Sequence, residues 1–131
     1  MVPDPDEICL HVCVTCREAG SPDDKALRPG ALLHKALTEA LARPDAPKVR
    51  IEAVECLSVC KRPCTIALSG PERWTYVYGD LNVETSVEAI LDGVRRYAST
   101  SDGLVPWRER PEAFRKGVVA RIPPLKTNSA A

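Results

Sequence analysis

The chain has 131 residues, 44% of them hydrophobic, and its 18 basic side chains balance 18 acidic ones. This length suits one domain with a tail and is too short for two ordinary domains. Because the charges balance, we expect neither nucleic acid nor a membrane as a partner. The first residues have no signal-peptide pattern and no apolar run approaches the length of a membrane span, so we expect a cytoplasmic protein.

The first half of the chain shows the pattern of a β-α-β unit. Apolar and polar residues alternate in ICLHVC, which predicts a strand over 8–13. A loop rich in glycine, proline and aspartate follows, and Pro29 and Gly30 then open a predicted helix over 31–42. Alternation returns over 49–54 and predicts a second strand. A β-α-β crossover makes its two strands parallel.

Two further strands and a second helix are predicted after the unit. TIALS (65–69) and WTYVYG (74–79) indicate an antiparallel pair joined by a turn, and a helix follows over 85–98, with Thr85 and Glu88 at capping-box spacing. From Ser99 onward the sequence has no sustained period. We expect this extension to dock on the domain or on a second subunit, with a disordered end after Pro124. The docking side chains we expect are Trp107, Phe114, Val118, Val119 and Ile122.

Five of the six cysteines follow the two parallel strands. CVTC carries Cys13 and Cys16 after the first strand, and CLSVCKRPC carries Cys56, Cys60 and Cys64 after the second. Loops that leave parallel strands emerge at the same edge of a sheet, so these thiols are predicted to meet. In a reducing cytosol such a group indicates a metal or redox site, whereas Cys9 is expected to be an ordinary core or surface thiol.

Cysteine spacing leaves the kind of site open. Soft thiolates suit zinc or an iron-sulfur cluster, and both cysteine groups satisfy the Cys-x2-4-Cys spacing of structural zinc. A dithiol after a first strand also indicates a thiol-disulfide oxidoreductase that uses Cys13 and Cys16. That interpretation leaves the other three cysteines of the group without a role, and the loop through Arg28 separates Cys16 from the first clear helix.

CREAG and CLSVC, placed after successive parallel strands, resemble the thioredoxin-like 2Fe-2S ferredoxins over 8–98. The resemblance implies an α/β, thioredoxin-like fold of ferredoxin type: a βαβ-ββα mixed four-stranded sheet with two helices, here followed by the C-terminal extension. It also implies a cluster held by Cys13, Cys16, Cys56 and Cys60. Cys64 is extra to the ferredoxin pattern, and we expect it to be an additional or alternative ligand. We accordingly expect a cysteine-rich cluster-binding domain over 1–98 and an extension over 99–131.

A closer resemblance runs nearly end to end. CVTCR, CLSVCKRPCTIAL, TYVYGDL and VPWRERPEAFRKGVVARIPP are similar to a bacterial family of small predicted metal-binding proteins, sometimes associated with cobalamin metabolism. Together the resemblances imply a small soluble electron-transfer or redox accessory protein with one 2Fe-2S cluster. The implied partner is a redox protein, and a homodimer is compatible with the extension. The alternatives are a zinc-stabilised binding module and the thiol-disulfide oxidoreductase.

The remaining polar residues give weaker predictions. Arg17, Lys61 and Arg62 adjoin the cysteines, where they either offset thiolate charge or are simply solvated. His11 is interpreted as an ordinary strand residue and His34 as solvated. Beyond the thiols the sequence shows no arrangement of catalytic acid, base or nucleophile, so we expect a carrier or metal-binding protein rather than an enzyme.

Overall fold

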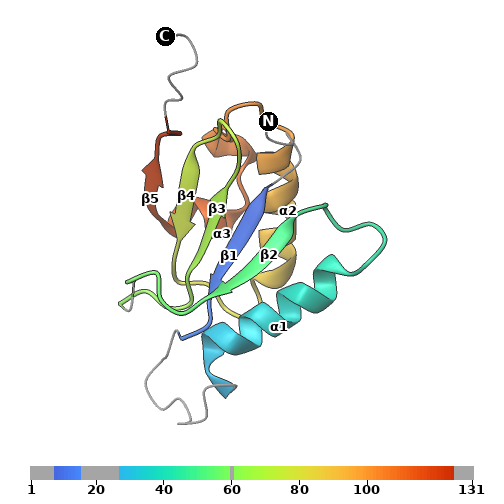
Figure 1. The fold of residues 1–131 in the computed structure, drawn as a ribbon, viewed down its shortest axis with the longest axis vertical. Helices are drawn as coiled ribbons and strands as arrows, with labels where there is room; N and C mark the ends of the chain where they lie inside the picture. The colour runs from blue at the N-terminus through green and yellow to red at the C-terminus, as the bar shows by residue number, and fades with distance from the viewer. Residues whose placement is uncertain (1–7, 16–26, 60, 126–131) are drawn as a thin grey trace.

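A five-stranded mixed sheet in the order β2-β1-β3-β4-β5 forms the frame of the molecule (Figure 1). The computed structural model describes residues 8–15, 27–59 and 61–125. Its elements are β1 (Cys9–Cys13), α1 (Pro29–Leu41), β2 (Arg50–Val54), β3 (Ile66–Ser69), β4 (Thr75–Tyr78), α2 (Val87–Ala98), the 3-10 turn η2 (Trp107–Glu109), α3 (Glu112–Lys116) and β5 (Val118–Ile122).

The predicted β-α-β unit and the hairpin are both confirmed. β1 pairs with β2 in parallel, with Leu10 opposite Ile51, and β3 pairs antiparallel with β1 and with β4. The fold class is therefore the predicted α/β class. Pro29 lies in the first turn of α1, where its fixed backbone angle suits a helix start and its missing N–H is not needed.

The start of α2 differs from the predicted capping box. Ser86, rather than Thr85, is the N-cap residue, and its hydroxyl accepts a hydrogen bond from the Asn82 N–H at 3.0 Å. Glu88 instead forms an ion pair with Arg43 at the end of α1, at 2.9 Å. The predicted Thr85–Glu88 capping box is therefore wrong, because the N-cap hydroxyl binds the preceding loop and the Glu88 carboxylate binds Arg43.

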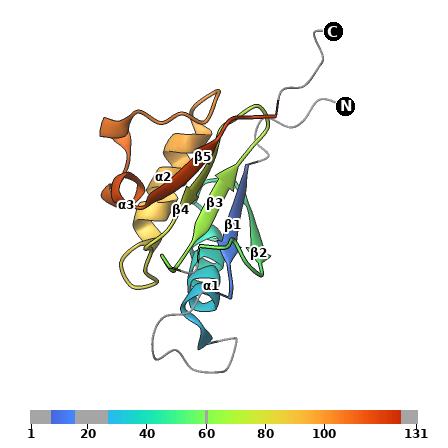
Figure 2. The same cartoon turned by 90° about the vertical axis from the view of Figure 1, so that its left-hand side faces the viewer.

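One face of the sheet carries the core. Leu10 and Val12 on β1 are fully buried, together with leucines of α1 and the apolar stripe of α2. Figure 2 shows α1, α2 and α3 gathered on one side of the sheet, and none of the helices in the described ranges lies on the other side. Alternate residues of β1 therefore face two different environments.

The C-terminal extension is part of the fold. It contributes α3 and β5, and β5 pairs antiparallel with β4, so the sheet has five strands instead of the four predicted. Phe114 of α3 is 2% exposed and stacks on Tyr78 with ring centroids 3.9 Å apart. Trp107 and Ile122 are 57% and 53% exposed, so they do not dock on the core of their own domain, and their docking on a second subunit stays a prediction. The predicted disordered end falls almost wholly beyond the described residues.

Across the three described ranges, no helix combines the length and apolar character needed to cross a membrane.

Candidate functional site

The loops that leave β1 and β2 meet at one edge of the sheet. The Val14 N–H donates to the Val54 carbonyl at 2.9 Å, and the Thr15 hydroxyl donates to the Glu55 carbonyl. The Cys13 Sγ lies 3.9 Å from the same Glu55 oxygen, directly before Cys56 in the chain. The predicted contact between the two loops is therefore present, and the meeting of their thiols stays a prediction. Of the predicted ligands, Cys16 and Cys60 lie outside the described residues, and so does Arg17.

The two described ligand candidates differ in exposure. Cys13 ends β1, is 4% exposed, and its N–H donates to the Thr65 carbonyl at 3.0 Å. Cys56 is exposed, and the Ser58 N–H donates to its Sγ at 3.2 Å. In an iron-sulfur site, a backbone N–H bonded to a ligand sulfur is one of the features that set the reduction potential.

Cys64 belongs to the core. It is 1% exposed and lies among the buried apolar residues. Its backbone is bonded in both directions to Leu81: the Cys64 N–H donates at 3.0 Å and the Cys64 carbonyl accepts at 3.2 Å. Its position is therefore determined by core packing and by this pair of backbone hydrogen bonds.

Arg62 joins the cysteine loop to the C-terminal extension. Its Nε donates to Asp80 Oδ2 at 2.8 Å, and its Nη2 and Nη1 donate to the carbonyls of Lys116 and Val118 at 3.2 Å and 3.4 Å. Because these acceptors occupy the guanidinium, Arg62 fixes the loop against β4 and β5, a role that local sequence does not reveal. Lys61, its neighbour, is exposed to solvent.

A second cluster of ligand-type side chains lies on the face of the sheet opposite α1, α2 and α3. Cys9, His11 and Glu52 bring their ligand atoms within 4.8 Å of one another. The pKa of His11 is lowered, chiefly by burial and further by Arg50, while Glu52 opposes the shift. The interpretation of His11 as an ordinary strand residue overlooked this cluster, because it forms only through the register that places Glu52 opposite His11. The alternation of Cys9 and His11 on one strand face was the available signal.

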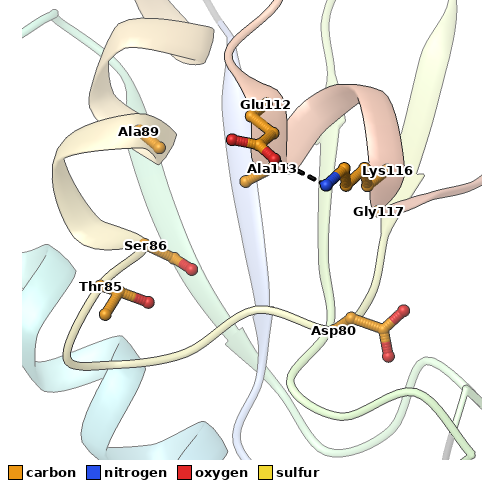
Figure 3. Close-up of a pocket in the computed structure, with 8 residues that line it drawn as sticks. All are labelled: Asp80, Thr85, Ser86, Ala89, Glu112, Ala113, Lys116 and Gly117. Atoms are coloured by element: carbon orange, nitrogen blue, oxygen red, sulfur yellow. Dashed lines mark ion pairs between the residues drawn. The ribbon is translucent and has the colours of Figure 1, made fainter.

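A cavity of about 500 Å³ lies between the start of α2 and α3 (Figure 3). Its polar groups come from Asp80, Thr85, Ser86 and the Glu112–Lys116 ion pair, at 2.7 Å. Neither a thiol nor an imidazole is among the described residues that line it. The cavity therefore adds no thiol or imidazole ligand to the cysteine loops or to the group of Cys9, His11 and Glu52.

Three comparisons with known proteins bear on this geometry. The model of the family described as "Protein of unknown function (DUF1636)" matches residues 10–124. No curated protein matches the chain significantly. A solved structure of a thioredoxin-like 2Fe-2S ferredoxin from Aquifex aeolicus is 19% identical, with a TM-score of 0.57, over 92% of this chain and 98% of the ferredoxin chain.

A second structure, of the wild-type thioredoxin-like 2Fe-2S ferredoxin of the same organism, is 17% identical with a TM-score of 0.54. It covers 87% of this chain and 97% of the ferredoxin chain. At these identities the likeness establishes the fold, which is the thioredoxin-like fold of ferredoxin type.

Proposed function

We propose that this chain, which belongs to the DUF1636 family and has the fold of the thioredoxin-like 2Fe-2S ferredoxins, is a small iron-sulfur protein. Its role would be electron transfer or that of a redox accessory protein. Cys13, Cys16, Cys56 and Cys60 would hold one 2Fe-2S cluster. A bound cluster supplies one-electron chemistry, and the protein supplies its ligands, its hydrogen bonds and a docking surface.

The observation that carries the proposal is the contact between the two cysteine loops. The Cys13 Sγ and the Thr15 hydroxyl both lie against the Glu55 carbonyl, and Cys56 is the next residue. Each loop carries two of the four proposed thiolates, so this contact supports a four-thiolate site at the sheet edge.

The chemistry of the donor set fits such a cluster. The Cys56 sulfur accepts the Ser58 N–H, a kind of hydrogen bond that tunes iron-sulfur clusters, and its exposure gives a redox partner access to the site. Cys60 is proposed as the fourth ligand from the resemblance to the ferredoxins, and Cys64, which is buried as Cys13 is, stays the alternative ligand.

The alternatives differ from this proposal in what the thiols do. A zinc-stabilised module would use the same four cysteines as a closed structural site. A thiol-disulfide oxidoreductase would require Cys13 or Cys16 as an accessible nucleophile, and the 4% exposure of Cys13 argues against that role for it. The redox partner, a cytoplasmic location, a homodimer, a bacterial source and the cobalamin association stay predictions.

Anaerobic purification with metal and sulfide assays tests the proposal. We expect a coloured protein whose visible bands bleach with dithionite, with iron and acid-labile sulfide in equal amounts. A colourless protein with stoichiometric zinc would favour the zinc-stabilised module. Protein without metal that cycles between dithiol and disulfide would favour the oxidoreductase.

Serine substitutions identify the ligands. We expect Cys13→Ser, Cys16→Ser, Cys56→Ser and Cys60→Ser each to lose most of the iron. Cys64→Ser is the matched control and should retain it. Loss of iron in Cys64→Ser with retention in Cys60→Ser would shift the ligand register of the second loop.

A further inference from the structure

The strand register brings a second group of polar side chains together on the side of the sheet opposite α1, α2 and α3. Cys9 and His11 alternate with the buried Leu10, so they share the opposite face of β1. β2 places Glu52 directly opposite His11, and β3 places Ser69 directly opposite Cys9. Side chains opposite one another in a sheet project from the same face, so three strands contribute to one cluster.

From this juxtaposition we propose that Cys9, His11 and Glu52 form a metal site for a zinc-class divalent cation, separate from the four-cysteine site. Their ligand atoms lie within 4.8 Å of one another, and the Cys9 Sγ is 3.8 Å from the His11 Nδ1. Ligands around tetrahedral zinc lie roughly 3.5 Å apart, given bonds of about 2.0–2.3 Å. A small movement of the Glu52 side chain, which is 44% exposed, is enough to close the set.

Ser69 orients the imidazole for this role. The His11 Nε2 lies 2.8 Å from the Ser69 Oγ, on the side of the ring away from the Nδ1. Metal-binding histidines usually donate their second N–H to such a partner, which fixes the tautomer and turns the other nitrogen's lone pair to the metal. When the Nε2–H donates to the Ser69 Oγ, the Nδ1 carries the lone pair, and this nitrogen faces the Cys9 sulfur.

Arg50 holds the carboxylate in the same way. Its Nη2 lies 2.8 Å from the Glu52 Oε1, so one carboxylate oxygen is anchored while the other stays available to a cation. A cation that binds here displaces the Cys9 thiol proton, because only a deprotonated thiol is a metal ligand. The Cys9 thiolate and the Glu52 carboxylate then supply two negative charges to the divalent cation.

The donor atoms select the metal. One sulfur, one nitrogen and one oxygen suit zinc and related borderline ions, whereas magnesium and calcium prefer oxygen alone. Three protein ligands leave a fourth position for water or a small anionic ligand, the pattern of an open zinc site. Cys9 and Cys13 are four residues apart, about 13 Å along a strand, so this site does not share ligands with the cysteine loops.

Cobalt binding to the full chain tests the proposal, because cobalt(II) reports its own coordination in visible and ultraviolet spectra. We expect the wild-type chain to take up one more cobalt ion than His11→Gln or Glu52→Gln, with four-coordinate d–d bands and a thiolate-to-cobalt charge-transfer band. Glu52→Gln changes an exposed side chain, so it is not expected to disturb folding. Neither substitution touches the cysteine loops, so the difference isolates this site whether or not those loops hold a cluster.

His34→Gln and Glu39→Gln on α1 are the matched controls, and both should bind cobalt as the wild type does. Cys9→Ser should remove the charge-transfer contribution of this site, and Ser69→Ala should weaken binding about tenfold or more. Equal stoichiometry and affinity in the wild type, His11→Gln and Glu52→Gln would overturn the proposal. So would a charge-transfer band that is unchanged in Cys9→Ser.

Discussion

Replacing Phe114 by alanine measures how far the C-terminal extension is part of the fold. The ring is 2% exposed, stacks on Tyr78 at 3.9 Å and packs so closely on Gly93 that a Cβ there would lie 2.1 Å from it. Truncation of a fully buried phenylalanine costs about 3–5 kcal/mol, because the transfer free energy of the ring is lost and a cavity is left behind. We expect about 4 kcal/mol for Phe114→Ala.

This loss converts into a shift in melting temperature. With an unfolding entropy of about 2.1 cal/mol/K per residue over 131 residues, 4 kcal/mol lowers the melting temperature by about 15 °C. Thermal denaturation followed by circular dichroism measures it. Trp107→Ala is the matched control, because Trp107 is an aromatic residue of the same extension that is 57% exposed, and it should shift the melting temperature by less than about 4 °C. A Phe114→Ala shift as small as that of Trp107→Ala would show that the extension does not stabilise the domain.

Three further predictions concern packing, charge and pH. Gly93→Ala should lower the free energy of unfolding by about 1–3 kcal/mol, because overpacking against Phe114 outweighs the better helix propensity of alanine; an unchanged urea midpoint would contradict it. Arg62→Met should cost about 1–2 kcal/mol in urea denaturation, since the ion pair it removes is partly exposed, and a neutral result would show that the loop is held by other contacts. Burial raises the pKa of Tyr78 and of Tyr97, so the fold favours the neutral phenols; the contribution of these two tyrosines to stability should be constant below about pH 10, where unfolded tyrosine begins to ionise, and should fall as the pH rises further. Urea midpoints that do not fall between about pH 9 and about pH 11 would refute this last expectation.

Elements with a strong local period were predictable from sequence. Leu10 and Val12 alternate with polar residues because one face of β1 lies on the core, and Leu33 and Leu37 recur at helical spacing because one stripe of α1 covers that face. The parallel pairing of β1 and β2 followed from the crossover between them. That pairing alone placed both cysteine loops at one edge.

The features that sequence reasoning missed depend on pairing between distant segments. β5 is an edge strand whose side chains are only partly buried, so it lacks a clear inward face, and its formation depends on hydrogen bonds to β4. The His11–Glu52 pair likewise depends on strand register. The Arg62–Asp80 pair depends on the return of β4 beside the cysteine loop. Periodicity within a segment carries no information about these partners.

The extension and the cysteine loop form one structural unit. Gly79 lies so close to the loop that a Cβ there would be 2.7 Å from the Arg62 carbonyl, and its N–H donates to the Gly117 carbonyl of the extension at 2.8 Å. Arg62 completes the connection through the carbonyls of Lys116 and Val118. A tail that merely followed the domain would leave these groups to water. The family model extends to residue 124, so the extension belongs to the sequence that the family shares. The connection through Arg62 and Gly79 gives that shared segment a physical role, because α3 and β5 fix the loop that carries Cys56 and Cys64.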